Sequence, residues 1–128
     1  MKETVKLLES GFESSSGKTP EFLKFVKVFK KEFKKELEKY VGIKDIKFNV
    51  GHFYISGFFT TNNDEIYYFS LPDVRQYVYA IVNNPNSVWC QLMYREARDY
   101  KDYTGGINRY VHIQPEMGEK MCWYFKTV

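Results

Sequence analysis

Residues 19–42 read TPEFLKFVKVFKKEFKKELEKYVG, and the fold class that the sequence predicts starts from this stretch. Thr19 is a helix-capping residue type, Pro20 suits the first helical position, and Gly42 is typical of the position just past a helix end. Between these signals, apolar residues recur every three or four positions and share one face: Phe22, Val26, Phe29, Phe33, Leu37 and Tyr40. The stretch therefore predicts a long amphipathic helix.

The opposite face of this helix is rich in lysine. At about 100° per residue, five lysines gather there with Glu38 as the only acid among them: Lys24, Lys27, Lys31, Lys34 and Lys35. Eight Lys and four Glu lie between Lys18 and Val41, a local balance of +4 against +3 for the whole chain. Two interpretations stay open. The lysines either bind the phosphate backbone of a nucleic acid or form the solvated side of an amphipathic helix.

After Gly42 the apolar residues alternate with a period of two, which is typical of strands. We expect strands over residues 43–50, 52–60 and 65–70, with Gly57 marking a bulge or a close approach. Residues 73–83 have helical spacing, although their β-branched and aromatic side chains leave a strand open. Further strands are expected over residues 88–95, 108–114 and 121–126. The predicted fold class is α+β, with the long amphipathic helix and a shorter helix packed on an antiparallel β-sheet.

The length of the chain, 128 residues, suits one hydrophobic core. We expect residues 1–18 to be a loosely attached N-terminal segment with a Ser-rich linker, and residues 19–128 to be a single α+β domain. The N-terminus lacks the apolar run of a signal peptide, and no stretch approaches the roughly 20 apolar residues of a membrane span. We therefore expect no membrane association and a cytoplasmic location, whereas the oligomeric state stays open.

Residue types that carry catalysis are scarce. The chain has eleven Tyr and eleven Phe but only two His and two Cys, and aromatic side chains serve cores and interfaces more than acid–base chemistry. His52 and His112 have no metal-ligand companion at a familiar spacing, and Cys90 and Cys122 fit packed thiols, with a disulfide left open. Residues 17–19, GKT, miss the spacing of a phosphate-binding loop by one, so a linker that ends in a helix cap is favoured. We expect no catalytic residue, metal or cofactor, and rank a small enzyme centred on either His last.

Several Tyr and Arg residues are interleaved along residues 94–110, which include a glycine pair. This combination is typical of protein interfaces and of surfaces that stack on bases. The partner-binding candidates are Tyr94, Arg95, Arg98, Tyr100, Tyr103 and Arg109. The alternative, that the Tyr rings cover the protein's own sheet, stays open.

Several short segments resemble small proteins encoded on phages and conjugative elements of Gram-positive bacteria, over about residues 10–111. These segments are residues 10–12 (SGF), 16–19 (SGKT), 51–59 (GHFYISGFF), 67–70 (YYFS) to 74–75 (VR), and 101–106 (KDYTGG). The resemblance implies the cytoplasm of a bacterial host cell as the location. It also implies a setting that includes anti-CRISPR proteins, which are short non-enzymatic inhibitors of Cas nucleases. We therefore expect a protein that binds and inhibits a bacterial defence nuclease such as Cas9, with nucleic-acid binding by the lysines as the alternative.

Overall fold

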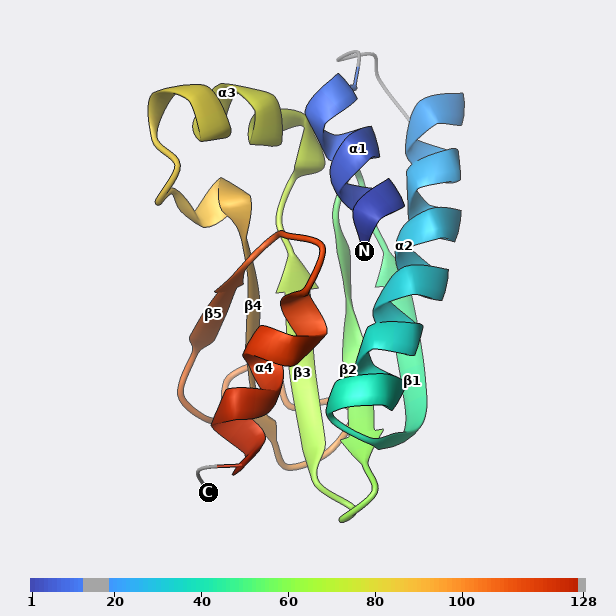
Figure 1. Cartoon of the computed structure of the whole chain (residues 1–128). Helices are drawn as coiled ribbons and strands as arrows, with labels where there is room; N and C mark the ends of the chain where they lie inside the picture. Colours follow the sequence, from blue (N-terminus) through green and yellow to red (C-terminus); the bar gives the residue numbers. More distant parts are fainter. Residues whose placement is uncertain (13–18, 127–128) are drawn as a thin grey trace.

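A computed structural model of the chain describes residues 1–12 and 19–126. Its sheet is a meander of five antiparallel strands in the order β1-β2-β3-β4-β5 (Figure 1). The elements in chain order are α1 (Lys2–Ser10), α2 (Pro20–Tyr40), β1 (Ile43–Val50), β2 (Ile55–Thr61), β3 (Ile66–Leu71), the 3-10 turn η1 (Val74–Gln76), α3 (Tyr77–Asn83), the 3-10 turn η2 (Val88–Cys90), β4 (Gln91–Ala97), β5 (Arg109–His112) and α4 (Met117–Lys126). The predicted α+β class is confirmed.

Helix α2 begins and ends where the sequence predicts. The Thr19 side chain accepts a hydrogen bond from the backbone N–H of Phe22 at 3.2 Å, which caps the first turn. At the other end, Gly42 has a φ of +85° and its N–H donates to the carbonyl of Leu37 at 2.7 Å. The apolar face packs on the sheet through aromatic rings, with Phe33 5.1 Å from Phe69 between centroids.

Three helices cover the same face of the sheet. Figure 1 shows α1, α2 and α4 on one side of the strands, whereas α3 lies at the end of the sheet beside α1. The predicted shorter helix at residues 73–83 therefore exists as η1 and α3, and the strand alternative for it is excluded. The second half of the sheet is covered by α4 instead.

The strand predicted over residues 121–126 is wrong, because these residues belong to helix α4. Met117 and Met121 are both buried, and Phe125 packs on Tyr67 with ring centroids 4.7 Å apart. Positions four residues apart share one face of a helix, so these three side chains enter the core together. Gly118 lets α4 approach α2 closely, since a Cβ there would lie 2.8 Å from the carbonyl oxygen of Glu36.

The N-terminal residues are part of the core, which corrects the expectation of a loosely attached segment. Met1 and Leu8 are buried in the main hydrophobic cluster. The backbone N–H and the hydroxyl of Thr4 both donate to one carboxylate oxygen of Glu32, at 2.7 and 2.6 Å. The expected Ser-rich linker, together with Gly17 and Lys18, lies outside the described residues.

Gly57 marks a close approach, as expected. A Cβ at this position would overlap the carbonyl oxygen of Lys47 on β1, so only glycine fits there. The irregularity in the ladder lies elsewhere, between Ile43 and Asp45. Among the helices of the described residues, none combines the length and apolar content that crossing a membrane requires.

Candidate functional site

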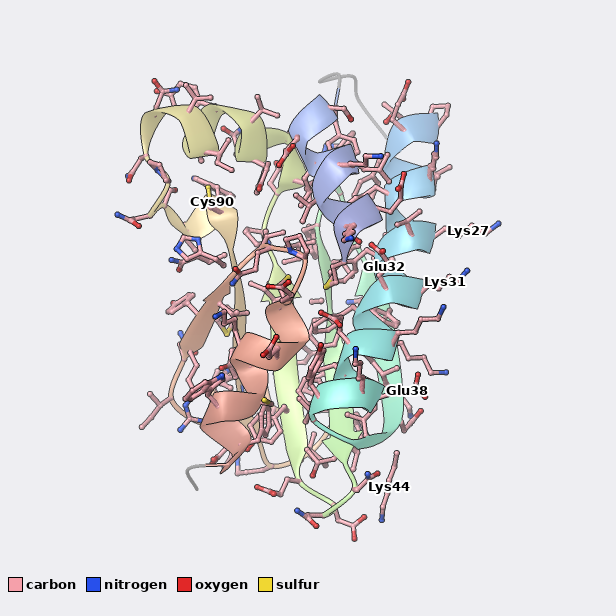
Figure 2. All side chains as sticks on the ribbon, in the orientation of Figure 1. Lys27, Lys31, Glu32, Glu38, Lys44 and Cys90 are labelled. Atoms are coloured by element: carbon pink, nitrogen blue, oxygen red, sulfur yellow. The ribbon has the colours of Figure 1, made fainter. Side chains whose placement is uncertain are left out.

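The lysine face of α2, defined as Lys24, Lys27, Lys31, Lys34 and Lys35, is exposed along its whole length. Lys27 and Lys31 point away from the sheet (Figure 2). Within residues 1–12 and 19–126, none of these five lysines forms an ion pair. Glu3 and Glu32 line a cavity together with Lys31 and Lys35, but neither carboxylate lies within ion-pair distance of these lysines.

Two of the acids on α2 accept hydrogen bonds from neighbouring helices. Glu32 lies toward α1 and binds Thr4 (Figure 2), while Glu36 accepts a hydrogen bond from the N–H of Gly118 on α4 at 3.3 Å. Burial raises the pKa of Glu32, but the hydrogen bonds from Thr4 and Glu3 and the charge of the N-terminal ammonium together outweigh it and lower the pKa overall. Both carboxylates thus hold neighbouring helices, and Glu38 is the acid that remains exposed among the lysines.

The dimensions of the lysine face match a phosphate backbone. Lys24 and Lys35 are eleven residues apart, which corresponds to about 16 Å along a helix axis at 1.5 Å per residue. One strand of B-DNA carries a phosphate about every 3.4 Å of its axis, so this length spans about five phosphates. The number of lysines is also five.

The candidate Tyr and Arg residues divide between the two faces of the sheet. Tyr94 is fully buried on the helix side, where its ring lies 6.2 Å from that of Phe125. Arg109 stands directly opposite Tyr94 in the β4–β5 register and therefore faces the same side. Successive residues of a strand point to opposite faces, which separates Tyr94 from Arg95. The prediction that Tyr94 anchors a partner at the surface is wrong.

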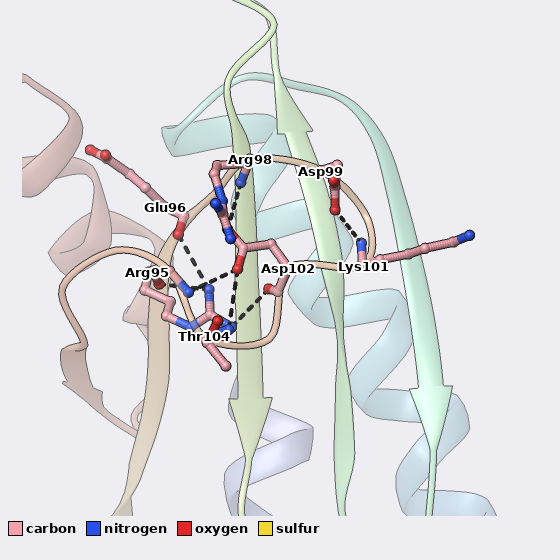
Figure 3. Close-up of polar contacts among 8 residues, drawn as sticks. Arg95, Glu96, Arg98, Asp99, Lys101, Asp102 and Thr104 are labelled. Atoms are coloured by element: carbon pink, nitrogen blue, oxygen red, sulfur yellow. Dashed lines mark hydrogen bonds and ion pairs between the residues drawn. The ribbon is translucent and has the colours of Figure 1, made fainter.

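Arg95 faces the other side of the sheet but is only 3% exposed. Its guanidinium donates to the carbonyls of Asp102 and Gly105, both at 2.8 Å, and to that of Glu96 at 3.3 Å (Figure 3). It also lies 4.7 Å from the ring centroid of Tyr68. Arg95 therefore holds the loop that follows β4, which corrects its prediction as a partner contact.

Asp102 stabilises the same loop through hydrogen bonds to other loop residues. Its carboxylate accepts hydrogen bonds from the N–H and the Nε of Arg98 at 2.9 and 3.1 Å, and from the N–H groups of Thr104 and Gly105 at 3.2 and 2.8 Å. These bonds hold the pKa of Asp102 well below its usual range, and the bond from the Arg98 side chain has the largest effect. Residues 98–108 thus form an ordered loop across the sheet face opposite α2 (Figure 3).

This loop lays two tyrosines on the sheet. Tyr100 hydrogen-bonds to Thr60 and packs on Phe58, while Tyr103 lies 5.6 Å from both Phe58 and Tyr68 between ring centroids. We call these four rings, Phe58, Tyr68, Tyr100 and Tyr103, the tyrosine platform. The alternative that the Tyr rings cover their own sheet is confirmed for Tyr100, whereas Tyr103 remains 60% exposed. Of the six candidates, Tyr103 and Arg98 offer the most surface.

A third surface was missed by the sequence prediction. Six apolar side chains are exposed on α3 and η2 and define the α3 surface: Val78, Tyr79, Ile81, Val82, Val88 and Trp89. The helical spacing of residues 73–83 predicted the helix but not its exposure, and in α3 only Tyr77 and Ala80 are buried. The available signal was the absence of any charged residue from position 77 to position 93.

None of the His and Cys residues is a member of these surfaces. His52 is exposed in the β1–β2 connection against Phe53, and His112 is exposed on β5. Cys90 and Cys122 are buried, free thiols, which answers the open question of a disulfide, and burial raises the pKa of Cys90. In the part of the chain that the structure describes, no group of three or more His, Cys, Asp or Glu is arranged to hold a metal ion.

Compared with known proteins, the chain matches no protein-family model, no curated protein and no solved structure.

Proposed function

We propose that this chain is a nucleic-acid-binding protein whose lysine face contacts the phosphate backbone. The observation that carries the proposal is that five exposed lysines remain unpaired while Glu32 and Glu36 of the same helix bind α1 and α4. A helix face that serves only solubility commonly mixes charges of both signs. A surface of one sign instead attracts a polyanion and raises its local concentration.

Binding of this kind reads the backbone and not the base sequence. Lysine ammonium groups act as mobile point charges on long stems, so they neutralise phosphates without fixed bidentate geometry. Each neutralised phosphate releases condensed counterions, and this release provides most of the free energy of non-specific binding. We therefore expect binding that tolerates many sequences and weakens steeply as salt is added.

The test compares charge reversal on the lysine face with charge reversal elsewhere. Lys27→Glu, Lys31→Glu and Lys34→Glu together should abolish binding of a fluorescein-labelled DNA at low salt, measured by fluorescence anisotropy. The matched control reverses Lys2, Lys6 and Lys120, which are also exposed and give the same change in net charge. Equal binding by the first variant and the parent, or no binding by the parent, would contradict the proposal.

Inhibition of a bacterial defence nuclease such as Cas9 is a second candidate function. The α3 surface favours it, because exposed and uncharged apolar patches are typical of protein interfaces. Cas9 holds its heteroduplex in a positively charged channel, to which the lysine face is not complementary. For this candidate we therefore propose that the α3 surface and Tyr103 contact the nuclease, whose identity rests on the sequence resemblance alone.

Co-elution with purified Cas9 orthologues tests the second candidate. Tyr79→Lys with Val82→Lys should abolish the complex, since a desolvated lysine at an apolar interface lacks a partner. The Lys27, Lys31 and Lys34 reversal should leave it intact. A complex that depends on the lysines and disappears after nuclease treatment of the sample would show bridging by nucleic acid and contradict direct inhibition.

A further inference from the structure

We propose that Tyr103 stacks on an unpaired base of a single-stranded nucleic acid, whose backbone reaches it from the lysine face across the edge strand β1. This inference rests on the proposed nucleic-acid binding and specifies its substrate as single-stranded. Bases inside a duplex are stacked on each other and cannot reach a ring on the protein surface. Single strands, by contrast, are bound by aromatic rings beside basic grooves.

The tyrosine platform presents Tyr103 as a rigid ring with free area. Phe58 and Tyr68 stack with centroids 5.2 Å apart, and Tyr103 packs on both of them at 5.6 Å. These contacts fix the ring, yet more than half of the side chain stays exposed. An aromatic side chain that is held in place loses little further entropy when a base stacks on it.

The backbone around Tyr103 is held as firmly as its ring. The two neighbours of Tyr103 take part in the Asp102 network, in which the Asp102 carboxylate accepts from the N–H of Thr104 and the Asp102 carbonyl accepts from Arg95 (Figure 3). The buried guanidinium of Arg95 also binds the Gly105 carbonyl, which closes the loop on both sides of Tyr103. The ring is therefore preorganised for stacking.

A shallow cavity next to Tyr103 supplies polar groups. Its volume is about 180 Å³, and its lining includes Tyr100, Tyr103, Lys47, Asn49 and Ser56. Pockets that enclose whole ligands measure about 300–1,000 Å³, so this one suits the edge of a stacked base. The lysine ammonium, the amide and the hydroxyl provide hydrogen-bond donors and acceptors for that edge.

Positive charge connects this cavity to α2 around strand β1. Lys30 of α2 extends over the ring of Phe48 on β1, with its ammonium 5.7 Å from the centroid. The preceding residue of that strand, Lys47, points to the opposite face and places its ammonium 4.7 Å from the ring of Tyr100. Figure 1 shows β1 as the edge strand beside α2. Lys30 and Lys47 thus place one positive charge on each side of β1, along the path that a phosphate backbone would follow from the lysine face to the tyrosine platform.

The experiment uses two probes that share their phosphates and differ in their bases: fluorescein-labelled oligothymidine of about 15 nucleotides, and an abasic oligonucleotide of the same length. Loss of one base–aromatic stack costs about 10-fold or more in affinity. We therefore expect the parent to prefer oligothymidine over the abasic strand by about 10-fold, and Tyr103→Ala to abolish this preference. Tyr103→Phe should retain it. Tyr79→Ala is the matched control, because Tyr79 is 69% exposed on α3 and should have no effect.

A second readout does not depend on any variant. With 2-aminopurine in the single strand, stacking on Tyr103 should quench its fluorescence in the parent complex. Equal affinity for both probes with no quenching would overturn this inference but leave phosphate binding by the lysine face intact. If neither probe binds at low salt, the proposed function fails, and this inference fails with it.

Discussion

Lys31 lies near the middle of the lysine face, and Lys31→Ala removes one of the five phosphate contacts that the proposed function predicts. The logarithm of affinity falls against the logarithm of salt with a slope of about −0.9 for each contact on duplex DNA. Five contacts give a slope of about −4.5, and four give about −3.6. Between about 50 and 200 mM salt, affinity should fall about 500-fold for the parent and about 150-fold for Lys31→Ala.

The measurement is a set of anisotropy titrations of a fluorescein-labelled duplex at several salt concentrations. A duplex tests the lysine face alone, because its stacked bases cannot reach Tyr103. Alanine is the best helix former, so Lys31→Ala keeps α2 intact, which circular dichroism verifies. Lys120→Ala on α4 is the matched control, because Lys120 is exposed but lies outside the lysine face. Its slope should equal that of the parent.

Two results would refute this reasoning. A parent slope shallower than about −1 would mean that the five lysines do not neutralise phosphates together. The same slope for Lys31→Ala and the parent would mean that nucleic acid binds at another surface. In either case, the unpaired lysines would be the solvated side of the helix.

Three further predictions concern the core, the loop and the thiols. Leu8→Ala should lower the free energy of unfolding, measured in urea, by about 2.7–5.0 kcal/mol, since Leu8 is fully buried. The control Leu23→Ala, at a half-exposed position, should lower it by less than about 1 kcal/mol. A loss below about 0.5 kcal/mol for Leu8→Ala would indicate a loosely attached N-terminal helix. Folding lowers the pKa of Asp102, so the ionised carboxylate stabilises the fold fully above the ordinary Asp pKa of about 4, and this contribution is lost as pH falls below that value. The difference in unfolding free energy between the parent and Asp102→Asn should therefore be constant from about pH 7 to 5 and narrow below about pH 4. A difference that already narrows between pH 7 and 5 would contradict this. Cys90 should react with a thiol reagent much more slowly in the native protein than in urea, because it is buried and its pKa is raised; equal rates would show that the site opens freely.

Local signals predicted the first half of the fold. Thr19, Pro20 and Gly42 act through the backbone of their own turns, so the bounds of α2 can be read without knowing what the helix packs on. The alternation of apolar residues in β1 and β3 likewise reports which side of each strand is buried, whereas β2 is buried on both faces. The exposure of the five lysines follows from the same periodicity, because the apolar face of α2 must turn to the core.

The tertiary structure alone decided the C-terminal helix and the composition of each surface. The apolar run in α4 suits a strand or a helix equally, and docking against α2 at Gly118 selects the helix. Tyr94 and Arg95 are neighbours in the sequence, yet one enters the core and the other binds the loop carbonyls, because successive residues of a strand face opposite sides.

The charge of the lysine face also depended on contacts between distant residues. The sequence places Glu32 and Glu36 on the same helix as the lysines, and only the packing of α1 and α4 shows that Thr4 and Gly118 bind these carboxylates. A side chain's helix position fixes its direction within the helix, but its partners come from elements far away along the chain. Periodicity thus determined where the lysines point, and tertiary contacts determined that they remain unpaired.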